Sequence, residues 1–594
     1  MVLVLVLLPA QGPNQERCSA RRRRQSPDSV EIAGQWFQSF SEAIHSQDAS
    51  AVSSCLFSDG YWRDLLTLSW DIRTLHTAST IKTFLKTDNR LKNSGLRELK
   101  LEGEPVLVEA KPGPGFTWIQ CFFEFETGVA RGRGFFRLMR DNLDGSWKAK
   151  ALYTGIEELK GHEEKLGKTR PNSVNYAHHT DQEEPVVLIV GVGQTGLSLG
   201  ARLKQLNIST ILIEQNDRVG DNWRKRYKSL VLHDPVWFDH LPYVPFPDHW
   251  PKFSPKDKLA DWFEAYAIIM NLNIWMRSSI KSAAYDEASH TWAVTISRTG
   301  YADQVIKPKF VVLATGVSGE PNIPVFKDQS LFKGPVYHSS QYKSAEEFKD
   351  KKAVIIGCCN SGHDIAQDFY EHGADVTIVQ RSSTYVISST AVGILLGAVY
   401  EKGTPPTEDA DIMNFSLPVD MYNDLHTYAT EQVAELDRDV LEGLRKAGFK
   451  LNTGINGAGL MLTYLSKGGG YYIDVGASNL IAKKKIKIKQ GHEISNFTQD
   501  SLVFDDGTEL EADIVVLATG YQNMKTTAIR ILGPEAERIS EVWGLDSEGE
   551  LNGIARSTGH PGIYTLGGNL AQARFLSKRL ALRIKAQLEG LAPF

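Results

Sequence analysis

The sequence predicts an α/β protein in which two doubly wound units, the second inserted in the first, follow an α+β unit. Three observations predict this class. A buried-type strand, a glycine-rich turn and a helix occur in this order twice, near residues 186–206 and 353–370. Two further apolar segments, 310–316 and 513–520, both end in Ala-Thr-Gly. The first 158 residues show helical periodicity and then strand-like segments.

Charge and cysteine content narrow the class of protein. The 594 residues include 66 Lys and Arg against 71 Asp and Glu, a formal charge of −5. This balance argues against a nucleic-acid binder, which presents a net basic surface. The five cysteines are too few and too irregularly spaced for a disulfide scaffold, and no C-x-x-C occurs. We therefore expect a protein of the cytoplasm, without a metal site.

The apolar segments are too short to cross a membrane. Residues 2–10 are apolar and the arginines 21–24 follow them, whereas a signal peptide carries its positive charge in front. A span needs about 20 apolar residues. We expect residues 1–28 to be a disordered tail, residues 391–400 to be a buried helix, and no stable membrane insertion.

The first folded unit combines helices with strands. Apolar residues recur at helical spacing up to about Ser46, and they are Val30, Ala33, Trp36, Phe37, Phe40 and Ile44. Strands are predicted at 103–110, 116–127, 130–140 and 147–157. With Tyr61-Trp62-Arg63-Asp64 between helices and sheet, residues 29–158 resemble the cone-shaped α+β family that includes ketosteroid isomerases and polyketide cyclases. Asp64 and His76 are a candidate acid/base pair, but the fold hosts many binders, so we favour dimerisation, giving a homodimer, or a lid over the main site.

The first glycine-rich turn follows a polar linker predicted over residues 159–184. Its glycines are Gly191, Gly193 and Gly196. In such a turn the first glycine makes the bend, the second admits a pyrophosphate, and the third lets helix and strand pack closely. Glu214 ends the next strand, where a carboxylate binds a ribose hydroxyl. This Rossmann-like unit is therefore predicted to bind FAD or NAD.

The second glycine-rich unit differs from the first at two positions, one in the turn and one after the next strand. Cys359 replaces the middle glycine, and its Cβ is expected to crowd a pyrophosphate. After its second strand the first unit has the carboxylate of Glu214, whereas the second unit has Arg381. A guanidinium can bind a 2′-phosphate through two hydrogen bonds, so we expect NADPH here. The residues expected to form the turn are Gly357, Asn360, Ser361 and Gly362. The alternative is a degenerate repeat kept only for packing.

The order of these segments predicts a discontinuous first unit. We expect an FAD-binding domain over 185–342 and 500–594 and an NADPH-binding domain with a substrate-side insertion over 343–499. The two Ala-Thr-Gly strand ends, the second closing at Gly520, are expected to pass close to a cofactor. Gly568 precedes a helix predicted over 571–588, whose N-terminus is expected to point at the flavin ring.

From about residue 185 to 590 the sequence resembles the flavin-containing monooxygenases, closest to the branch with indole-pyruvate monooxygenases. The two turns carry this resemblance, together with Gly220-Asp221-Asn222-Trp223 and residues 332–342, which fit F-x-G-x-x-x-H-x-x-x-[YF]. Tyr342 closes that fingerprint, where Baeyer–Villiger relatives usually carry Trp. Asp221 replaces a usual glycine, and Asp tolerates a left-handed backbone.

The resemblance implies FAD and NADPH as cofactors and a C4a-hydroperoxyflavin that uses O₂ to oxygenate a small organic substrate at N or S. Oxygenation of a ketone, aldehyde or 2-oxo acid is the alternative, because the two reactive forms differ by one proton. Trp223, His233 and Asp234 are expected to line the flavin, and His338 to couple domain motion or to be a packing histidine. Candidate catalytic residues are Asn360, Arg381 and His233.

Two further classes compete. A disulfide reductase shares the two-nucleotide architecture but needs a redox cysteine pair, whereas Cys358 and Cys359 lie inside the nucleotide turn. A non-catalytic flavin- or ligand-binding protein would oxidise no NADPH.

Overall fold

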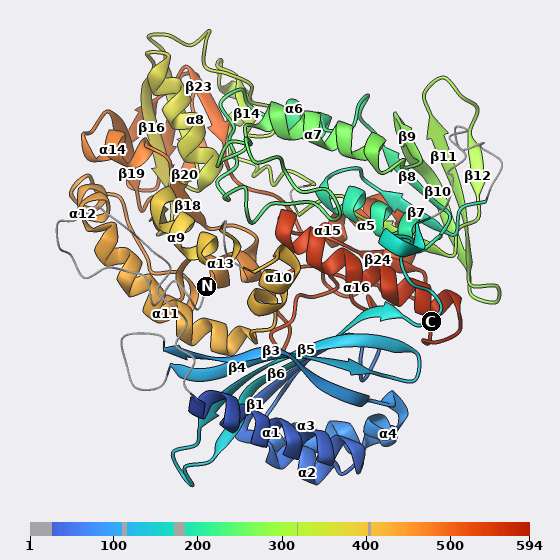
Figure 1. Cartoon of the computed structure of the whole chain (residues 1–594). Helices are drawn as coiled ribbons and strands as arrows, with labels where there is room; N and C mark the ends of the chain where they lie inside the picture. Colours follow the sequence, from blue (N-terminus) through green and yellow to red (C-terminus); the bar gives the residue numbers. More distant parts are fainter. Residues whose placement is uncertain (1–26, 110–115, 171–183, 318, 402–404) are drawn as a thin grey trace.

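The computed structural model describes residues 27–109, 116–170, 184–317, 319–401 and 405–594 (Figure 1). The predicted tail lies outside the described residues as far as residue 26, and helix α1 begins at Pro27. Residues 171–183, half of the predicted linker, also lie outside.

A six-stranded sheet and four helices form the N-terminal unit. Its strands lie in the order β2-β1-β6-β5-β4-β3, and all neighbours are antiparallel except β1 and β6. The elements are α1 (Pro27–His45), α2 (Ala49–Ser54), β1 (Leu56–Leu65), β2 (Ile72–His76), α3 (Ala78–Lys86), α4 (Arg90–Ser94), β3 (Arg97–Glu109), β4 (Thr117–Glu126), β5 (Ala130–Arg140) and β6 (Trp147–Leu159). The predicted first helix and four strands are confirmed. Residues 61–64, expected between helices and sheet, instead lie inside strand β1, which the sequence pattern did not predict.

Successive residues of β1 serve opposite faces of this sheet. Trp62 packs with Trp36, Phe40 and Phe123 of the aromatic core beneath α1. Arg63 contacts later segments of the chain on the other face. Side chains alternate along a strand, so one face is covered by the unit's own helices and the other is free to dock. Figure 1 shows the sheet between α1–α4 and the group α10, α11 and α16.

The first glycine-rich turn belongs to a five-stranded parallel sheet in the order β24-β13-β7-β8-β9. Its strands and helices are β7 (Val187–Val190), α5 (Gln194–Gln205), β8 (Thr210–Glu214), α6 (Asp221–Arg224), α7 (Lys256–Ile269), β9 (Ile274–Met276), β13 (Phe310–Leu313), β24 (Ile563–Thr565) and α16 (Leu570–Leu588). An antiparallel sheet flanks it, made of β10 (Ser278–Asp286), β11 (Thr291–Arg298) and β12 (Gln304–Ile306). Residues from the N-terminal and C-terminal parts of the predicted FAD-binding unit thus share one sheet.

The second turn belongs to a like sheet in the order β14-β23-β15-β16-β19, again all parallel. Its elements are β14 (Val336–His338), β15 (Lys352–Ile356), α8 (Asn360–Glu371), β16 (Asp375–Gln380), α14 (Ala477–Ala482), β19 (Ile486–Gln490) and β23 (Ile514–Leu517). Beside it lie β20 (Ile494–Phe497), β21 (Ser501–Phe504) and β22 (Glu509–Glu511). Strands β14 and β23 pair here, although the predicted boundaries at 342 and 500 group them with the first unit. Each Ala-Thr-Gly strand therefore lies next to the turn strand of its own sheet.

A mainly helical segment joins β16 to β19 and lies between the second sheet and the N-terminal unit (Figure 1). It contains β17 (Tyr385–Ser388), α9 (Ser389–Tyr400), α10 (Thr407–Phe415), α11 (Val419–Leu436), α12 (Arg438–Lys446), α13 (Gly459–Lys467) and β18 (Tyr471–Asp474), and α15 (Met524–Leu532) follows β23. The helix predicted at 391–400 is confirmed and buried along most of its described side chains.

Arginines of the N-terminal sheet bind the end of helix α10. Arg137 donates to the carbonyl of Met413 at 2.7 Å and to Ser416 Oγ at 2.9 Å, and Arg63 donates to the carbonyl of Phe415. Free carbonyls at a helix C-terminus carry partial negative charge, so these cations stabilise the junction. Ion pairs between the N-terminal unit and later segments include Arg63–Glu550, Arg73–Glu548, Asp71–Arg583, Arg133–Asp409, Glu157–Arg579 and Glu157–Lys578. The N-terminal unit is thus fixed to the rest of the molecule.

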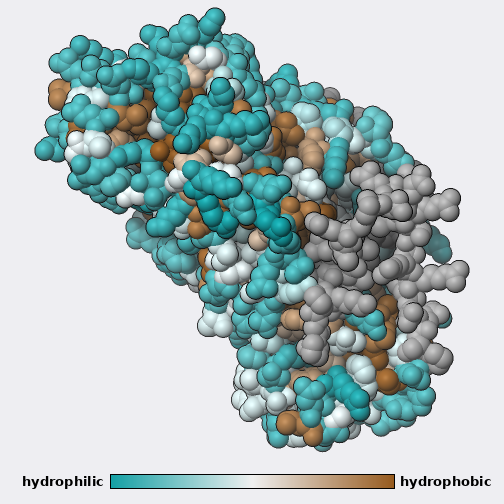
Figure 2. Space-filling model, turned by 90° about the vertical axis from the view of Figure 1, so that its left-hand side faces the viewer, coloured by the Kyte–Doolittle hydropathy of each residue, from teal (hydrophilic) through white to brown (hydrophobic). Residues whose placement is uncertain are grey.

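The face drawn in Figure 2 is largely hydrophilic where residues are described, with hydrophobic side chains in scattered groups. Among the described helices, none combines the length and the apolar character that crossing a bilayer requires.

Candidate active site

At two of the three glycines in the first glycine-rich turn, any side chain would clash with the backbone. Gly191 has φ +105°, and a Cβ there would lie 2.5 Å from the Ala314 carbonyl oxygen. A Cβ on Gly196 would lie 2.0 Å from the Gly191 carbonyl oxygen. At Gly193 a Cβ would lie 3.3 Å from Nδ2 of Asn222, a close contact with the end of a side chain rather than with the backbone. The first and last glycines are thus closed by backbone atoms, whereas at the middle one, where a pyrophosphate is expected, no backbone atom lies as near.

The second turn repeats this geometry. Gly357 has φ +114°, and its Cβ would lie 2.3 Å from the Ala518 carbonyl oxygen. A Cβ on Gly362 would lie 2.1 Å from the Gly357 carbonyl oxygen. Both Ala-Thr-Gly strands therefore pass close to the first glycine of a turn. Cys359 has φ −97°, near the −86° of Gly193, so its backbone needs no glycine, and its crowding of a pyrophosphate stays a prediction.

The helices after the two turns start without a side-chain cap. Helix α5 follows Gly193 and α8 follows Cys359, and neither residue's side chain binds the first-turn amides. Some helices are capped by a side chain, as α9 is by Ser388 and α16 by Asn569, whereas others such as α7 and α11 are also uncapped but follow no glycine turn. Uncapped amides at the positive end of a helix dipole are an anion site. The turns thus fit the phosphates of FAD and of NADPH.

Glu214 closes β8 directly beside the first turn. Its carboxylate accepts from the Val192 amide at 3.0 Å and from the Asn216 amide at 3.0 Å and side chain at 2.8 Å. Two backbone amides hold the carboxylate at the turn, where a lone pair remains for a ribose hydroxyl. This placement fits the predicted role.

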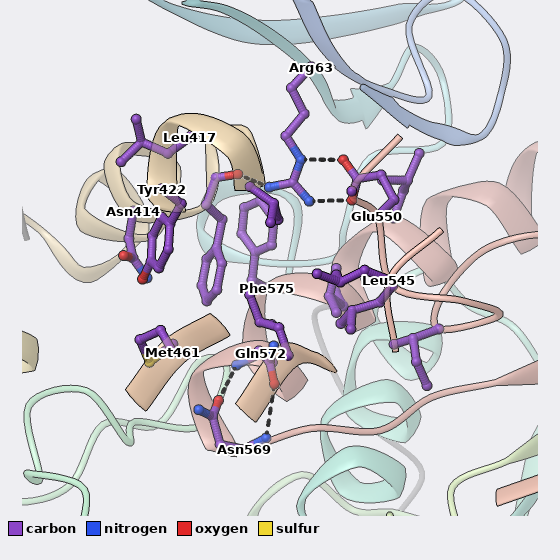
Figure 3. A pocket seen from close by; sticks show the side chains of 18 of the residues that line it. Arg63, Asn414, Leu417, Tyr422, Met461, Leu545, Glu550, Asn569, Gln572 and Phe575 are labelled. Carbon is purple, nitrogen blue, oxygen red and sulfur yellow. Dashed lines mark hydrogen bonds and ion pairs between the residues drawn. The ribbon is translucent and has the colours of Figure 1, made fainter. Parts of the chain in front are cut away.

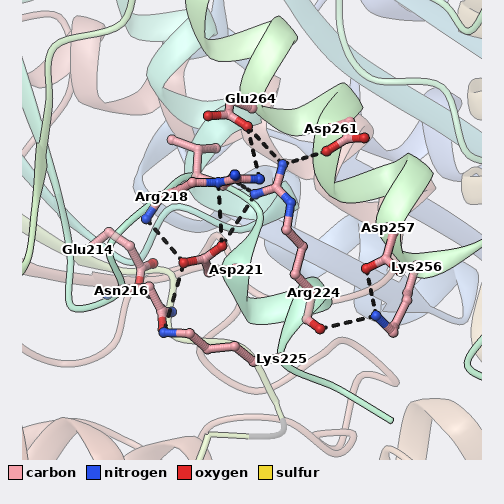
Figure 4. Close-up of polar contacts among 11 residues, drawn as sticks. Glu214, Asn216, Arg218, Asp221, Arg224, Lys225, Lys256, Asp257, Asp261 and Glu264 are labelled. Atoms are coloured by element: carbon pink, nitrogen blue, oxygen red, sulfur yellow. Dashed lines mark hydrogen bonds and ion pairs between the residues drawn. The ribbon is translucent and has the colours of Figure 1, made fainter. Parts of the chain in front are cut away.

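The turn at Asp221 forms with a backbone conformation that the sequence did not predict. Gly220 takes the left-handed conformation, with φ +88°, and Asp221 is the first residue of α6. Asp221 is buried, accepts from the Arg218 amide at 3.2 Å and pairs with Arg224 at 3.3 Å (Figure 4). The expectation that Asp221 itself needs a left-handed backbone is therefore wrong. The neighbouring Trp223 has a buried indole N–H without a hydrogen-bond partner among the described residues, which fits an acceptor on a bound cofactor.

His233 and Asp234 lie where the two nucleotide units meet. His233 Nε2 is 3.8 Å from Asp364 of helix α8, so it faces the second unit as well as the first. Burial raises the pKa of the Asp234 carboxyl to about 6, and nearby His233 partly offsets this effect. Their contact with flavin stays a prediction.

The residues predicted around the second nucleotide meet at one large open cavity. Gly357, Cys359, Arg381 and Gly520 line it. Arg381 is exposed and makes no ion pair within the described part of the chain. Asn360, in contrast, accepts from the Ile473 amide at 2.8 Å, so its side chain joins α8 to β18. Arg381 is thus free to bind a phosphate, whereas Asn360 is already engaged.

His338 of the fingerprint is a satisfied, buried histidine. Its Nδ1 lies 2.9 Å from Ser340 Oγ and its Nε2 lies 3.0 Å from the Gly520 carbonyl. Burial lowers its pKa. These bonds agree with the packing interpretation and leave no nitrogen for a base.

The structure contradicts an acid/base pair in the N-terminal unit. Asp64 is fully buried and accepts from Thr154 Oγ1 at 2.7 Å and from the Leu68 amide at 2.9 Å. His76 is exposed and stacks on Tyr61 with ring centroids 4.2 Å apart. His76 pairs with Tyr61, which lies three positions before Asp64 on β1. Because side chains alternate along a strand and paired residues share a face, His76 and Asp64 point to opposite faces of the sheet.

The sequence did not predict a pocket that forms where several segments of the chain meet. We call it the central pocket, and six of its lining residues are Arg63, Phe415, Tyr422, Glu550, Gln572 and Phe575 (Figure 3). They come from β1, α10, α11, the segment before β24, and α16. One local signal was present, the capping box Asn569-x-x-Gln572 at the start of α16.

Comparisons with known proteins agree with this geometry. The family model "Flavin-binding monooxygenase-like" matches residues 187–394. Indole-3-pyruvate monooxygenase YUCCA1 of Oryza sativa subsp. japonica is 30% identical over 386 residues, which cover 64% of this chain and 86% of that protein. Probable indole-3-pyruvate monooxygenase YUCCA3 of Arabidopsis thaliana is 32% identical over 342 residues, 57% of this chain and 73% of that protein.

A solved structure shares the fold. Oxidised steroid monooxygenase bound to NADP matches with a TM-score of 0.50 and 17% identity, covering 69% of this chain and 86% of that chain. The family match begins after the N-terminal unit, which therefore lies outside it. With two nucleotide turns in like parallel sheets and relatives of this similarity, the chain belongs to the flavin-binding monooxygenase-like family, the FAD- and NADPH-dependent monooxygenases.

Proposed function

We propose that this monooxygenase oxygenates a small organic substrate at a carbonyl carbon, as found in a ketone, an aldehyde or a 2-oxo acid. The relatives support this choice, because they are named for indole-3-pyruvate, a 2-oxo acid. Oxygenation at nitrogen or sulfur, which the sequence placed first, is the second candidate. In either reaction one atom of O₂ enters the substrate, the other leaves as water, and NADPH supplies two electrons.

The observation that carries the cofactor assignment is the pair of glycine turns, each closed by backbone atoms at its first and last glycine and each followed by a helix without a side-chain cap. We propose the first for FAD, with Gly191, Gly193, Gly196, Glu214, Trp223, Asp234 and Gly568. We propose the second for NADPH, with Gly357, Ser361, Gly362, Arg381 and Gly520. When bound, FAD supplies the redox centre that accepts electrons from NADPH and activates O₂.

The chain's own residues bind and orient more than they transfer protons. Arg381 is proposed to bind the 2′-phosphate, because it is exposed in the cavity wall and has no carboxylate partner among the described residues. Asn360 is proposed as a positioning residue, since it holds the Ile473 amide and with it the strand that faces the turn. His233 is proposed to lie beside the flavin and to link it to α8 through Asp364.

The proposal is tested with purified, flavin-loaded protein. We expect bound FAD, oxidation of NADPH that accelerates with substrate, and a product that carries ¹⁸O from labelled O₂. Matched substrates that differ only in the reacting group, a methyl ketone and the corresponding thioether, separate the two candidates. An oxygenated ketone with an unchanged thioether supports the carbonyl reaction, and the reverse supports oxygenation at sulfur. A protein without FAD, or one that makes only hydrogen peroxide with every substrate, refutes the proposal.

The domain limits stay proposals as well. Limited proteolysis is expected to cut between 159 and 184 before it cuts within 185–342, 343–499 or 500–594. A cytoplasmic location and a homodimer are also proposed. Cell fractionation tests the location, and light scattering tests the oligomeric state.

A further inference from the structure

The central pocket extends from the start of helix α16 to the N-terminal sheet. At its lower end in Figure 3, Asn569 and Gln572 form the cap of α16. Gly568, just before that cap, accepts a hydrogen bond from Gln194 Nε2 of helix α5 at 3.1 Å. At its upper end Arg63 enters from β1. A molecule in this pocket therefore lies against the start of α16, whose preceding residue contacts α5, and also against the N-terminal unit.

Most of the pocket wall is apolar. Phe415 and Phe575 both line it and stack on each other with ring centroids 4.7 Å apart. Met461 and Leu545 also line it, and Ile72 of the N-terminal unit, only 2% exposed, completes the wall. Pockets that are lined mainly by apolar and aromatic side chains bind the apolar body of a ligand.

Both cations of the wall are neutralised by carboxylates. Arg63 Nε and Nη2 donate to the two oxygens of Glu550, each at 2.7 Å, a bidentate pair. Arg556 pairs with Asp546 at 2.6 Å. A buried carboxylate on a ligand would find no free cation here, and desolvating an unpaired charge is costly.

Neutral polar groups are present at the end nearer the nucleotide turn. Gln572 Oε1 accepts from Tyr464 Oη at 2.8 Å, which fixes the amide plane. A carbonyl oxygen can accept a hydrogen bond from an amide N–H₂ such as that of Gln572. The carbonyl group of a ligand can therefore be bound at the Gln572 end of the pocket, and its apolar body lies along the apolar part of the wall.

We infer that the central pocket is the substrate site, that the N-terminal unit supplies one of its walls, and that the substrate is a neutral ketone or aldehyde with an apolar body rather than a 2-oxo acid. This inference rests on the proposed function and narrows it. It also gives the N-terminal unit a role in specificity, in place of a lid that opens and closes.

The first test changes the wall that the N-terminal unit supplies. Calorimetric binding of straight-chain methyl ketones of increasing length is measured on FAD-loaded Ile72→Ala and Ile72→Phe. We expect the preferred chain to lengthen in the first variant and to shorten in the second, with affinities changed about tenfold. Ile119→Ala is the matched control, because Ile119 is equally buried in the same sheet but packs in the aromatic core beneath α1. A length preference that Ile72 variants leave unmoved overturns the inference.

The second test concerns charge. The wild-type protein is expected to bind a methyl ketone about 100-fold more tightly than the 2-oxo acid of equal length. Glu550→Gln leaves Arg63 without its carboxylate and is expected to raise 2-oxo acid affinity at least about tenfold. Glu548→Gln removes the carboxylate of Arg73 outside the pocket and is expected to change neither ligand.

These measurements distinguish a failure of the substrate-site inference from a failure of the proposed function. Equal affinity for both ligand classes, with turnover of either, overturns the inference and leaves the monooxygenase proposal standing. Ketones that bind with the expected dependence on Ile72 but are never oxygenated support the pocket and refute the proposed reaction. Loss of FAD from both Ile72 variants but not from Ile119→Ala shows that the pocket holds the flavin, which also overturns the inference.

Discussion

Replacing Gly362 by alanine tests the second nucleotide turn at its tightest point. The added Cβ would lie 2.1 Å from the Gly357 carbonyl oxygen and 2.9 Å from its carbonyl carbon, both under the 3.0 Å that real Cβ contacts respect. Both are backbone atoms, and Gly357 is itself wedged against Ala518, so the turn cannot withdraw. Such an overlap costs about 3 kcal/mol, or roughly 100-fold in an equilibrium constant.

We therefore expect Gly362→Ala to raise the KM for NADPH about 100-fold while the protein keeps its FAD. Gly196→Ala makes the same overlap in the first turn, 2.0 Å from the Gly191 carbonyl oxygen, and is expected to lose FAD. Flavin absorbance of the purified protein and steady-state NADPH oxidation measure the two effects. Gly34→Ala, in open space on α1, is the control and is expected to stabilise the protein by about 0.5–1 kcal/mol. If Gly362→Ala keeps the wild-type KM, or loses flavin while Gly196→Ala retains it, the assignment of the two turns is wrong.

Three other outcomes are expected. Arg381→Ala should weaken NADPH by about 1.5–3 kcal/mol and leave NADH unchanged, measured as KM, and an equal loss for both nucleotides contradicts the phosphate contact. Burial raises the pKa of Asp64 to about 6 against 3.8 for an ordinary aspartate, so the folded state binds more protons than the unfolded state. The free energy of unfolding should then fall by about 3 kcal/mol as pH rises from about 4 to 6, and urea titrations of Asp64→Asn should lack this slope. Burial opposes ionisation of Glu157, but Arg579 and Lys578 outweigh it and hold the pKa at about 2. Its stabilisation should be complete above about pH 4.5 and lost as pH falls toward 2, and Glu157→Gln should show no such acid loss in thermal melts.

The nucleotide turns were predictable because their signals are local. The backbone angles at Gly191 and Gly357 and the close approach at Gly196 and Gly362 follow from a few neighbouring residues. The same is true of the helix cap at Asn569, which a capping box marks. Short-range sterics thus determined which residues the sequence revealed.

The central pocket was not predictable for the opposite reason. Arg63 and Glu550 are 487 positions apart, and nothing in the neighbourhood of either residue indicates the other. Residues 61–64 were expected between helices and sheet, whereas they lie in strand β1, where Trp62 faces the aromatic core and Arg63 faces a docking partner hundreds of residues away. Asp64 suggested chemistry, although its two hydrogen bonds make it a structural carboxylate.

The contact between Arg63 and Glu550 also has a consequence for biosynthesis. The ribosome releases β1 long before Glu550 exists, and at about 5–20 residues per second the interval is roughly 25–100 s. During that time the arginines of the N-terminal sheet and the aromatic rings beside them face water without their carboxylates. The nascent chain then exposes a surface of unpaired charges of both signs beside apolar side chains, which is the kind of surface that chaperones shield. Expression of this protein should therefore depend on what protects its first 160 residues until the last helix has been made.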